Sequence, residues 1–280
     1  MSSLSPANSV RVIAVTSGKG GVGKTNLSVN LAVAMARRGE RVLLMDADLG
    51  LGNVDVLLGL KSEKNLSHVL ANQASLDDIV LEGPEGIGIL PASSGVKHMA
   101  ELSAAENTGL IQAFSSLQRP VDTLIIDTAA GIADSVVRFS QASNAVIVVV
   151  CDEPASITDA YAMIKVLSRE HGVSRFFVVA NMVRDAGEGR RLFDKLNAAA
   201  ARFLDVTLVH LGSVPFDEYL RRAIQRQKPV LQAFGGARAS LAFGQIADQI
   251  MRWPKPRGAD GRLQFFVERL VQVTSELDAL

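Results

Sequence analysis

The chain has 280 residues, of which 48% are hydrophobic and 21% are charged, so it can bury a sizeable core and is not a disordered chain. Lys and Arg number 29, as do Asp and Glu, and the zero net charge disfavours a strongly basic nucleic-acid binder. Apolar runs are too short to span a bilayer, no secretory signal precedes Val10, and Cys151 is the one cysteine, so we expect a cytoplasmic protein without disulfides.

Short apolar runs alternate with helical segments along most of the chain. The runs are rich in β-branched residues and end in glycine, a carboxylate or a turn, which is typical of buried parallel strands. The predicted strands are 10–16, 41–45, 123–126, 145–151, 175–180 and 207–211, and the predicted helices are 26–38, 103–118, 134–142, 155–171 and 187–204. This alternation predicts an α/β fold with a mostly parallel, doubly wound sheet, whose chemistry gathers at the carboxyl ends of the strands.

The composition changes near the carboxyl end, where residues 253–261 are rich in Pro and Gly. We therefore expect four parts. They are a short amino-terminal segment 1–9, a main domain 10–252, a linker 253–261, and an amphipathic helix with a polar tail 262–280.

A phosphate-binding loop follows the first predicted strand. Residues 17–25 read SGKGGVGKT and match G-x-x-x-x-G-K-[ST] between a strand and a helix, the context that this motif requires. Glycines let backbone N–H groups surround a phosphate, Lys24 is expected on the β- and γ-phosphates, and Thr25 is expected on Mg²⁺. The nucleotide-binding residues predicted here are Gly18, Lys19, Gly20, Gly21, Val22, Gly23, Lys24, Thr25 and Asn26.

Carboxylates end two other predicted strands. Asp46 and Asp48 are two residues apart and point to the same side if the chain stays extended, so both could face the γ-phosphate and its metal. Asp127 ends the strand 123–126 and begins D-T-x-x-G, which is typical of a carboxylate that binds Mg²⁺ through water. An Asp-rich turn or a helix cap is the alternative, chiefly for Asp55.

The base is predicted to be adenine. Guanine-binding proteins of this broad class carry N-K-x-D after a strand, whereas residues 181–184 here read NMVR. Because the lysine and the acid are absent, the sequence favours ATP over GTP.

The loop sequence K-G-G-x-G-K-[ST] resembles the deviant Walker A motif of the MinD/ParA family. The resemblance implies an ATP-dependent homodimer in which Lys19 reaches the nucleotide, ATP or ADP with Mg²⁺, of the second subunit. It also implies that Asp48 positions the attacking water and that Asp46 assists, with Thr25, Asp46 and Asp127 serving the metal. On the nucleoside side, it implies that Glu153 contacts the ribose of the second subunit's nucleotide. It also implies contacts from Asn181, Val214, Pro215, Phe216 and Asp217. The alternatives to these nucleotide contacts are that Lys19 is an exposed charge in the loop and that Glu153 belongs to an ordinary helix start.

Three segments, DLGLGNVDVLLGL, CDEPASITDAYAMIK and GRLQFFVERLVQ, resemble the FlhG subgroup of this family. The resemblance implies a slow regulatory ATP hydrolase that controls flagellar number and placement. It further implies action with the GTPase FlhF, restraint of the flagellar transcription activator FleQ, and residence on the membrane at the cell pole in the ATP-bound state. The subgroup's D-Q-A-x-x-L-R motif, which stimulates FlhF, is not found before Val10.

The last predicted helix is amphipathic. Its apolar residues follow the spacing of one helix face, and basic residues accompany them from Arg252 to Arg269. This pattern favours binding of the helix to an anionic membrane surface, and packing of the helix against the main domain is the alternative. Both interpretations hold if the helix is docked without ATP and released when ATP binds. The predicted membrane residues are Leu263, Phe265, Phe266, Val267, Leu270 and Val271.

Other functions remain as alternatives. A ParA-type partition ATPase would need a surface for non-specific DNA, for which the candidates are Arg221, Arg222, Arg226 and Lys228. A MinD-type regulator of the division site is a further alternative, whereas an iron–sulfur carrier would need paired cysteines. We expect no direct sequence-specific binding of nucleic acid.

Overall fold

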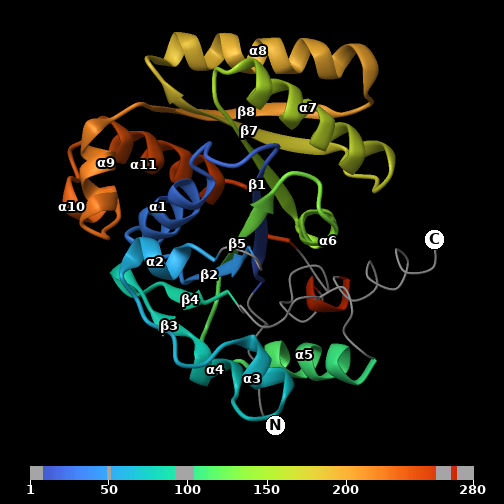
Figure 1. The fold of residues 1–280 in the computed structure, drawn as a ribbon, viewed down its shortest axis with the longest axis vertical. Coiled ribbons are helices and arrows are strands. Elements are labelled where there is room, and N and C mark those ends of the chain that lie inside the picture. Colours follow the sequence, from blue (N-terminus) through green and yellow to red (C-terminus); the bar gives the residue numbers. More distant parts are fainter. Residues whose placement is uncertain (1–8, 49–51, 93–103, 257–265, 270–280) are drawn as a thin grey trace.

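The structure is a computed structural model that describes residues 9–48, 52–92, 104–256 and 266–269. Its strands are β1 Arg11–Ser17, β2 Val42–Ala47, β3 Leu81–Glu82, β4 Gly88–Leu90, β5 Thr123–Ala130, β6 Ala145–Val150, β7 Arg175–Val183 and β8 Thr207–Pro215. They form one sheet in the order β3-β4-β2-β5-β1-β6-β7-β8, parallel except for the antiparallel pair β3 and β4 (Figure 1). The predicted mostly parallel sheet is confirmed.

Helices cover both faces of this sheet. The longer ones are α1 Lys24–Ala36, α5 Ala104–Ser116, α6 Asp134–Ala142, α7 Pro154–Arg169, α8 Ala186–Phe203, α9 Glu218–Gln225 and α11 Arg238–Met251. The shorter ones are α2 Val54–Leu58, α3 Leu66–Leu70, α4 Leu76–Ile79, the 3₁₀ turn Pro84–Gly86 and α10 Val230–Ala233. Among the described residues, no helix is long and apolar enough to cross a membrane.

The alternation of side chains along the strands explains the two layers of helices. In β1, Ile13 and Val15 pack with α1 and α11 on one face, whereas Val12 packs with α5 and α6 on the other. Farther along the sheet, α7 and α8 cover the second face over β6 and β7 (Figure 1). Each fully buried aliphatic side chain contributes roughly 1.5–3 kcal/mol, so both faces stabilise the sheet.

The differences from the predicted elements are local. The first helix begins at Lys24, two residues before the predicted start, because Gly23 takes a left-handed conformation (φ 87°) and turns the phosphate loop directly into α1. The short elements β3, β4 and α2 to α4 were not predicted, because two to five residues carry too little periodicity. Helices α9 to α11 were also not predicted.

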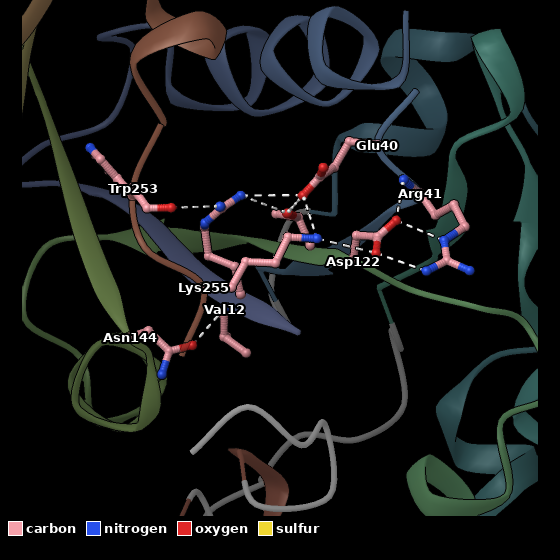
Figure 2. Close-up of polar contacts among 9 residues, drawn as sticks. Val12, Glu40, Arg41, Asp122, Asn144, Trp253 and Lys255 are labelled. Carbon is pink, nitrogen blue, oxygen red and sulfur yellow. Dashed lines mark hydrogen bonds and ion pairs between the residues drawn. The ribbon is translucent and has the colours of Figure 1, made fainter. Parts of the chain in front are cut away.

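Charged side chains lie together at the amino ends of the strands. This amino-end network consists of Arg11, Glu40, Arg41, Asp122 and Lys255 (Figure 2). Arg11 is buried, and its guanidinium donates to Glu40 Oε1 at 3.3 Å and to the Trp253 carbonyl at 3.2 Å. Lys255 Nζ lies 3.3 Å from Asp122 Oδ1, and the Trp253 ring packs on Phe177 with centroids 4.1 Å apart. The first residues of the predicted linker are therefore held against the sheet.

Candidate nucleotide site

The predicted phosphate loop joins the end of β1 to the start of α1. Gly21 and Gly23 have φ angles of 80° and 87°, a region where glycine escapes the strain of other residues. Gly18 packs directly on α7, since a Cβ there would lie 2.2 Å from the carbonyl carbon of Asp159. The turn and this close approach explain the glycines, and the N-terminus of α1 adds its favourable potential for an anion.

Asp127, in the second half of β5, contacts three side chains from the first turns of α1. Lys24 Nζ lies 2.9 Å from its Oδ1, Thr25 Oγ1 donates to its Oδ2 at 2.7 Å, and Ser28 Oγ donates to its Oδ1 at 2.9 Å. Lys24, Ser28 and Asp127 are all buried. Ser28 was not predicted, because a serine inside a helix carries no sequence signal.

The residues present fit a magnesium ion. A threonine hydroxyl and a carboxylate are oxygen ligands of the kind that Mg²⁺ takes alongside phosphate oxygens and water. Thr25 and Asp127, two of the three predicted metal residues, are in hydrogen-bond contact, so both can turn toward one ion. When bound, Mg²⁺ neutralises charge on the phosphates.

Asp46, the third predicted metal residue, accepts hydrogen bonds from the backbone in this structure. Its carboxylate accepts hydrogen bonds from the amides of Asp48 at 3.1 Å, Asn53 at 2.9 Å and Val54 at 3.0 Å. Burial raises the pKa of Asp46 to about 6, and the charge of Asp127 acts in the same direction, while the backbone hydrogen bonds oppose the shift. Asp46 therefore orders the segment that carries Asp48 and also caps the start of α2.

A hollow of about 910 Å³ opens over the phosphate loop. Its lining contains predicted residues, namely Gly20, Gly21, Gly23, Lys24, Thr25, Asn26 and Asp48. It also contains residues that were not predicted, namely Ser17, Asn53, Val56, Leu57, Ala129, Ala130, Met182, Ile224 and Gln227. Of these, Met182 follows the predicted Asn181, but α2 and α9 carry no motif that could have placed them here.

The residues predicted on the adenine side lie outside the lining of this hollow. Asn181 is buried, and its Nδ2 donates to the Val22 carbonyl at 2.7 Å, so it supports the phosphate loop. Asp217 caps α9 by accepting from the Tyr219 amide at 2.9 Å, and it also accepts from the Ala239 amide at 2.9 Å. Nearby, Val214 is buried, Pro215 lines a separate hollow of about 220 Å³, and Phe216 is 61% exposed.

Lys19 and Glu153, both predicted to serve a second subunit, pair with each other inside this chain. Lys19 Nζ lies 2.7 Å from Glu153 Oε2, and this hydrogen bond raises the pKa of Lys19. The lysine side chain is 33% exposed and the glutamate side chain 60% exposed. Water therefore reaches both charges, and the pair can separate.

Two of the six predicted membrane residues are described, and both are buried. Phe266 and Val267 pack in the cluster that contains Leu110, Phe114 and Phe139 of α5 and α6. Arg269 donates to the Gln141 carbonyl at 2.6 Å. Leu263, Phe265, Leu270 and Val271 lie outside the described residues. In this conformation the described part of the helix is docked on the main domain.

A sequence profile of the family described as "ParA: NUBPL iron-transfer P-loop NTPase" matches residues 8–251. The chain belongs to the ParA family of P-loop NTPases. It is accordingly an ATP hydrolase that works with Mg²⁺. The phosphate loop and the Thr25–Asp127 pair fit this chemistry. Cys151, the one cysteine in the sequence, is buried.

Relatives within the family resemble the chain over nearly its whole length. The Antiactivator FleN of Pseudomonas aeruginosa is 54% identical over 97% of both chains. The Flagellum site-determining protein YlxH of Helicobacter pylori is 36% identical over 86% of this chain and 80% of its own length. Among solved structures, septum site-determining MinD of Pyrococcus horikoshii OT3 with Mg-ADP is 26% identical, with a TM-score of 0.67, covering 87% of this chain and 96% of that one.

Proposed function

We propose that this chain is an FlhG-type ATP switch that controls flagellar number and placement. The observation that carries the proposal is the 54% identity to Antiactivator FleN over 97% of both chains. The similarity to a flagellum site-determining protein supports the same reading. By this proposal the switch restrains the flagellar transcription activator FleQ and acts with the GTPase FlhF.

In the proposed cycle, ATP closes two copies of the chain into a homodimer. Lys24 leaves Asp127 for the β- and γ-phosphates, and Thr25 and Asp127 then serve the metal. Lys19 leaves Glu153 and contributes its ammonium group to the nucleotide of the second subunit, while Glu153 turns to that subunit's ribose. The partial exposure of the Lys19–Glu153 pair supports this exchange, because solvated ion pairs are held weakly.

Hydrolysis is assigned to the segment that follows β2. Asp48 lines the hollow and orients the attacking water, which forms a bond to the γ-phosphorus as the bond to the β-phosphate oxygen breaks. Asp46 assists by fixing the backbone around Asp48 through its hydrogen bonds. On the adenine side, we assign Asn181 and the loop 214–217 to the base, which requires a rearrangement because these residues lie outside the lining of the hollow.

The carboxyl-terminal helix is proposed to bind an anionic membrane when ATP is bound. Phe266 and Val267 are docked in this structure, so binding requires their release, and two released helices in a dimer bind far more tightly than one. The proposal is therefore a cytoplasmic protein that resides reversibly on the membrane at the cell pole. Phe266→Asp should abolish flotation with anionic liposomes in ATP, whereas Phe203→Asp, at a phenylalanine that is 55% exposed on α8, should not.

The experiment that tests the function combines assembly and complementation. Light scattering after size-exclusion chromatography should show a monomer with ADP and a dimer with ATP and Mg²⁺, and Asp48→Ala should stabilise that dimer. In a polarly flagellated bacterium that lacks its FlhG-type protein, the wild-type chain should restore flagellar number and repress a FleQ-dependent reporter, whereas Lys24→Ala should do neither. A chain that stays monomeric with a non-hydrolysable ATP analogue, or that leaves flagellation unchanged, contradicts the proposal.

A further inference from the structure

Gln227, immediately after α9, has an unusual backbone conformation. Its φ is 52°, in the left-handed region where a side chain is strained and glycine is not. The amides of Gln227 and Lys228 bond the carbonyls of Ile224 and Ala223, which forms the helix-ending turn that ordinarily carries glycine. Favourable contacts of the glutamine side chain can offset this strain.

That side chain joins α9 to α2 across the hollow. Gln227 Nε2 donates to the Val56 carbonyl at 2.9 Å. Its Oε1 lies 3.0 Å from the position that a Cβ on Gly59 would occupy, and Gly59 is the left-handed residue (φ 63°) that ends α2. The ends of the two helices thus meet through one amide, which we call the Gln227 bridge. Gln227, Val56 and Ile224 all line the nucleotide hollow.

The opposite end of α2 is held by Asp46. Asp46 Oδ2 accepts from the amides of Asn53 and Val54, and Asp46 Oδ1 accepts from the amide of Asp48. A continuous path of hydrogen bonds and one helical turn therefore runs from Gln227 through α2 and Asp46 to Asp48. Because α2 has only five residues, contacts at its two ends rather than its own hydrogen bonds set its position.

We propose that Gln227 is a positioning residue for ATP hydrolysis. Its amide holds α2 in place, and through Asp46 it sets where Asp48 stands over the phosphate loop. This rests on the proposed role of Asp48. The contacts expected to bind phosphate come from residues 18–25. Among the described residues, the Gln227 side chain makes no hydrogen bond to that loop. The bridge should thus matter more for turnover than for affinity.

Two variants separate positioning from stability. Gln227→Glu keeps the shape but replaces the donor with an acceptor that faces the Val56 carbonyl. Gln227→Gly also removes the donor and at the same time relieves the left-handed strain, so its Tm should stay within about 2 °C of wild type. We expect both to lower kcat roughly tenfold, with the Kd for ADP changed less than about threefold. Gln225→Glu, at an exposed position of the same helix, is the matched control and should turn over normally.

A double-mutant cycle tests the route. If Gln227 acts through Asp48, Gln227→Gly should lower turnover in the wild-type chain and have no further effect in Asp48→Ala. In parallel, hydrogen exchange of the amides of 54–59 should speed up in Gln227→Glu and not in Gln225→Glu. Normal turnover in Gln227→Gly, additive effects in the cycle, or unchanged exchange overturns the proposal. Normal hydrolysis by Asp48→Ala alone is a different failure, that of the role assigned to Asp48.

Discussion

The carboxyl ends and the amino ends of the strands both carry buried charged residues, but the two groups of residues differ in what they contact. At the carboxyl ends of the strands, buried Lys24 and Asp127 lie beside an open hollow of about 910 Å³. At the amino ends, the side chains of the amino-end network bind one another and the start of the predicted linker (Figure 2). At the carboxyl ends, Lys24 and Asp127 can exchange their contact with each other for contacts with a ligand. At the amino ends, the charged residues hold separate chain segments together.

Two aspartates make the difference measurable. Burial raises the pKa of Asp46 to about 6 at the carboxyl end, whereas the hydrogen bonds from Arg41 hold the pKa of Asp122 well below its usual range at the amino end. A raised carboxylate pKa means that the fold tolerates the charge poorly, and a lowered one means that the fold needs it. The charge on Asp46 thus destabilises the fold, whereas the charge on Asp122 stabilises it.

The largest effect is expected where the open end meets its ligand. Lys24→Ala should weaken the binding of ADP with Mg²⁺ about a thousandfold, because it removes the buried ammonium group and leaves the Asp127 carboxylate beside the phosphates. Titration calorimetry measures the change. Lys61→Ala, at an exposed lysine, is the control and should bind normally. A loss of affinity smaller than about tenfold in Lys24→Ala would remove the phosphate loop from its assigned role.

The next effect is the pH dependence of Asp46. Since its folded pKa is raised from 3.8 to about 6, the native state holds the proton more tightly than the unfolded chain between these values. The unfolding free energy of wild type relative to Asp46→Asn should therefore fall by up to about 3 kcal/mol as the pH rises from about 4 to about 6, and stay constant above. Urea denaturation across this range measures it. If the unfolding free energy of wild type relative to Asp46→Asn rises with pH instead, burial does not raise the pKa of Asp46.

The pH dependence of the unfolding free energy should have the opposite sign at Asp122. Its contribution is full above about pH 4, the unfolded pKa, and declines as the pH falls below it. Asp122→Asn should lower the unfolding free energy by about 1–2 kcal/mol at pH 7, because the bonds to Arg41 and Lys255 lose their charge. Asp194→Asn, in a well-exposed pair with Arg190, is the matched control and should change little. Equal losses in both variants would mean that the amino-end network adds no stability.

The parts of the molecule that sequence patterns predicted are those encoded contiguously. The phosphate loop, its strand and its helix lie within residues 10–38, so one stretch carries both the motif and its structural context. The strands that follow were predicted for the same reason, since a buried parallel strand is an apolar run with a definite end.

Features assembled from distant segments were not predictable in this way. Gln227 and Val56 meet only because α9 and α2 fold over the same loop, and neither lies in a recognisable motif. Arg11, Glu40 and Asp122 meet because β5 lies between β2 and β1 in the sheet. This strand order does not follow from the alternation of strands and helices along the chain. Asp46 was predicted at the right place, but its hydrogen bonds to backbone depend on a turn that side-chain patterns do not specify.

The smallest effect is expected at Glu153, and it sharpens the contrast within the phosphate loop itself. The loop has two lysine–carboxylate pairs of similar length, Lys24–Asp127 at 2.9 Å and Lys19–Glu153 at 2.7 Å, but only the first is buried. Glu153→Ala should therefore change the unfolding free energy by less than about 0.5 kcal/mol, whereas Asp127→Ala should cost about 3–5 kcal/mol because it strands a buried ammonium group. Denaturant unfolding of both variants without nucleotide measures the difference. A loss above about 1 kcal/mol in Glu153→Ala would mean that this pair is part of the fold, and Lys19 would then not be free to leave for a second subunit.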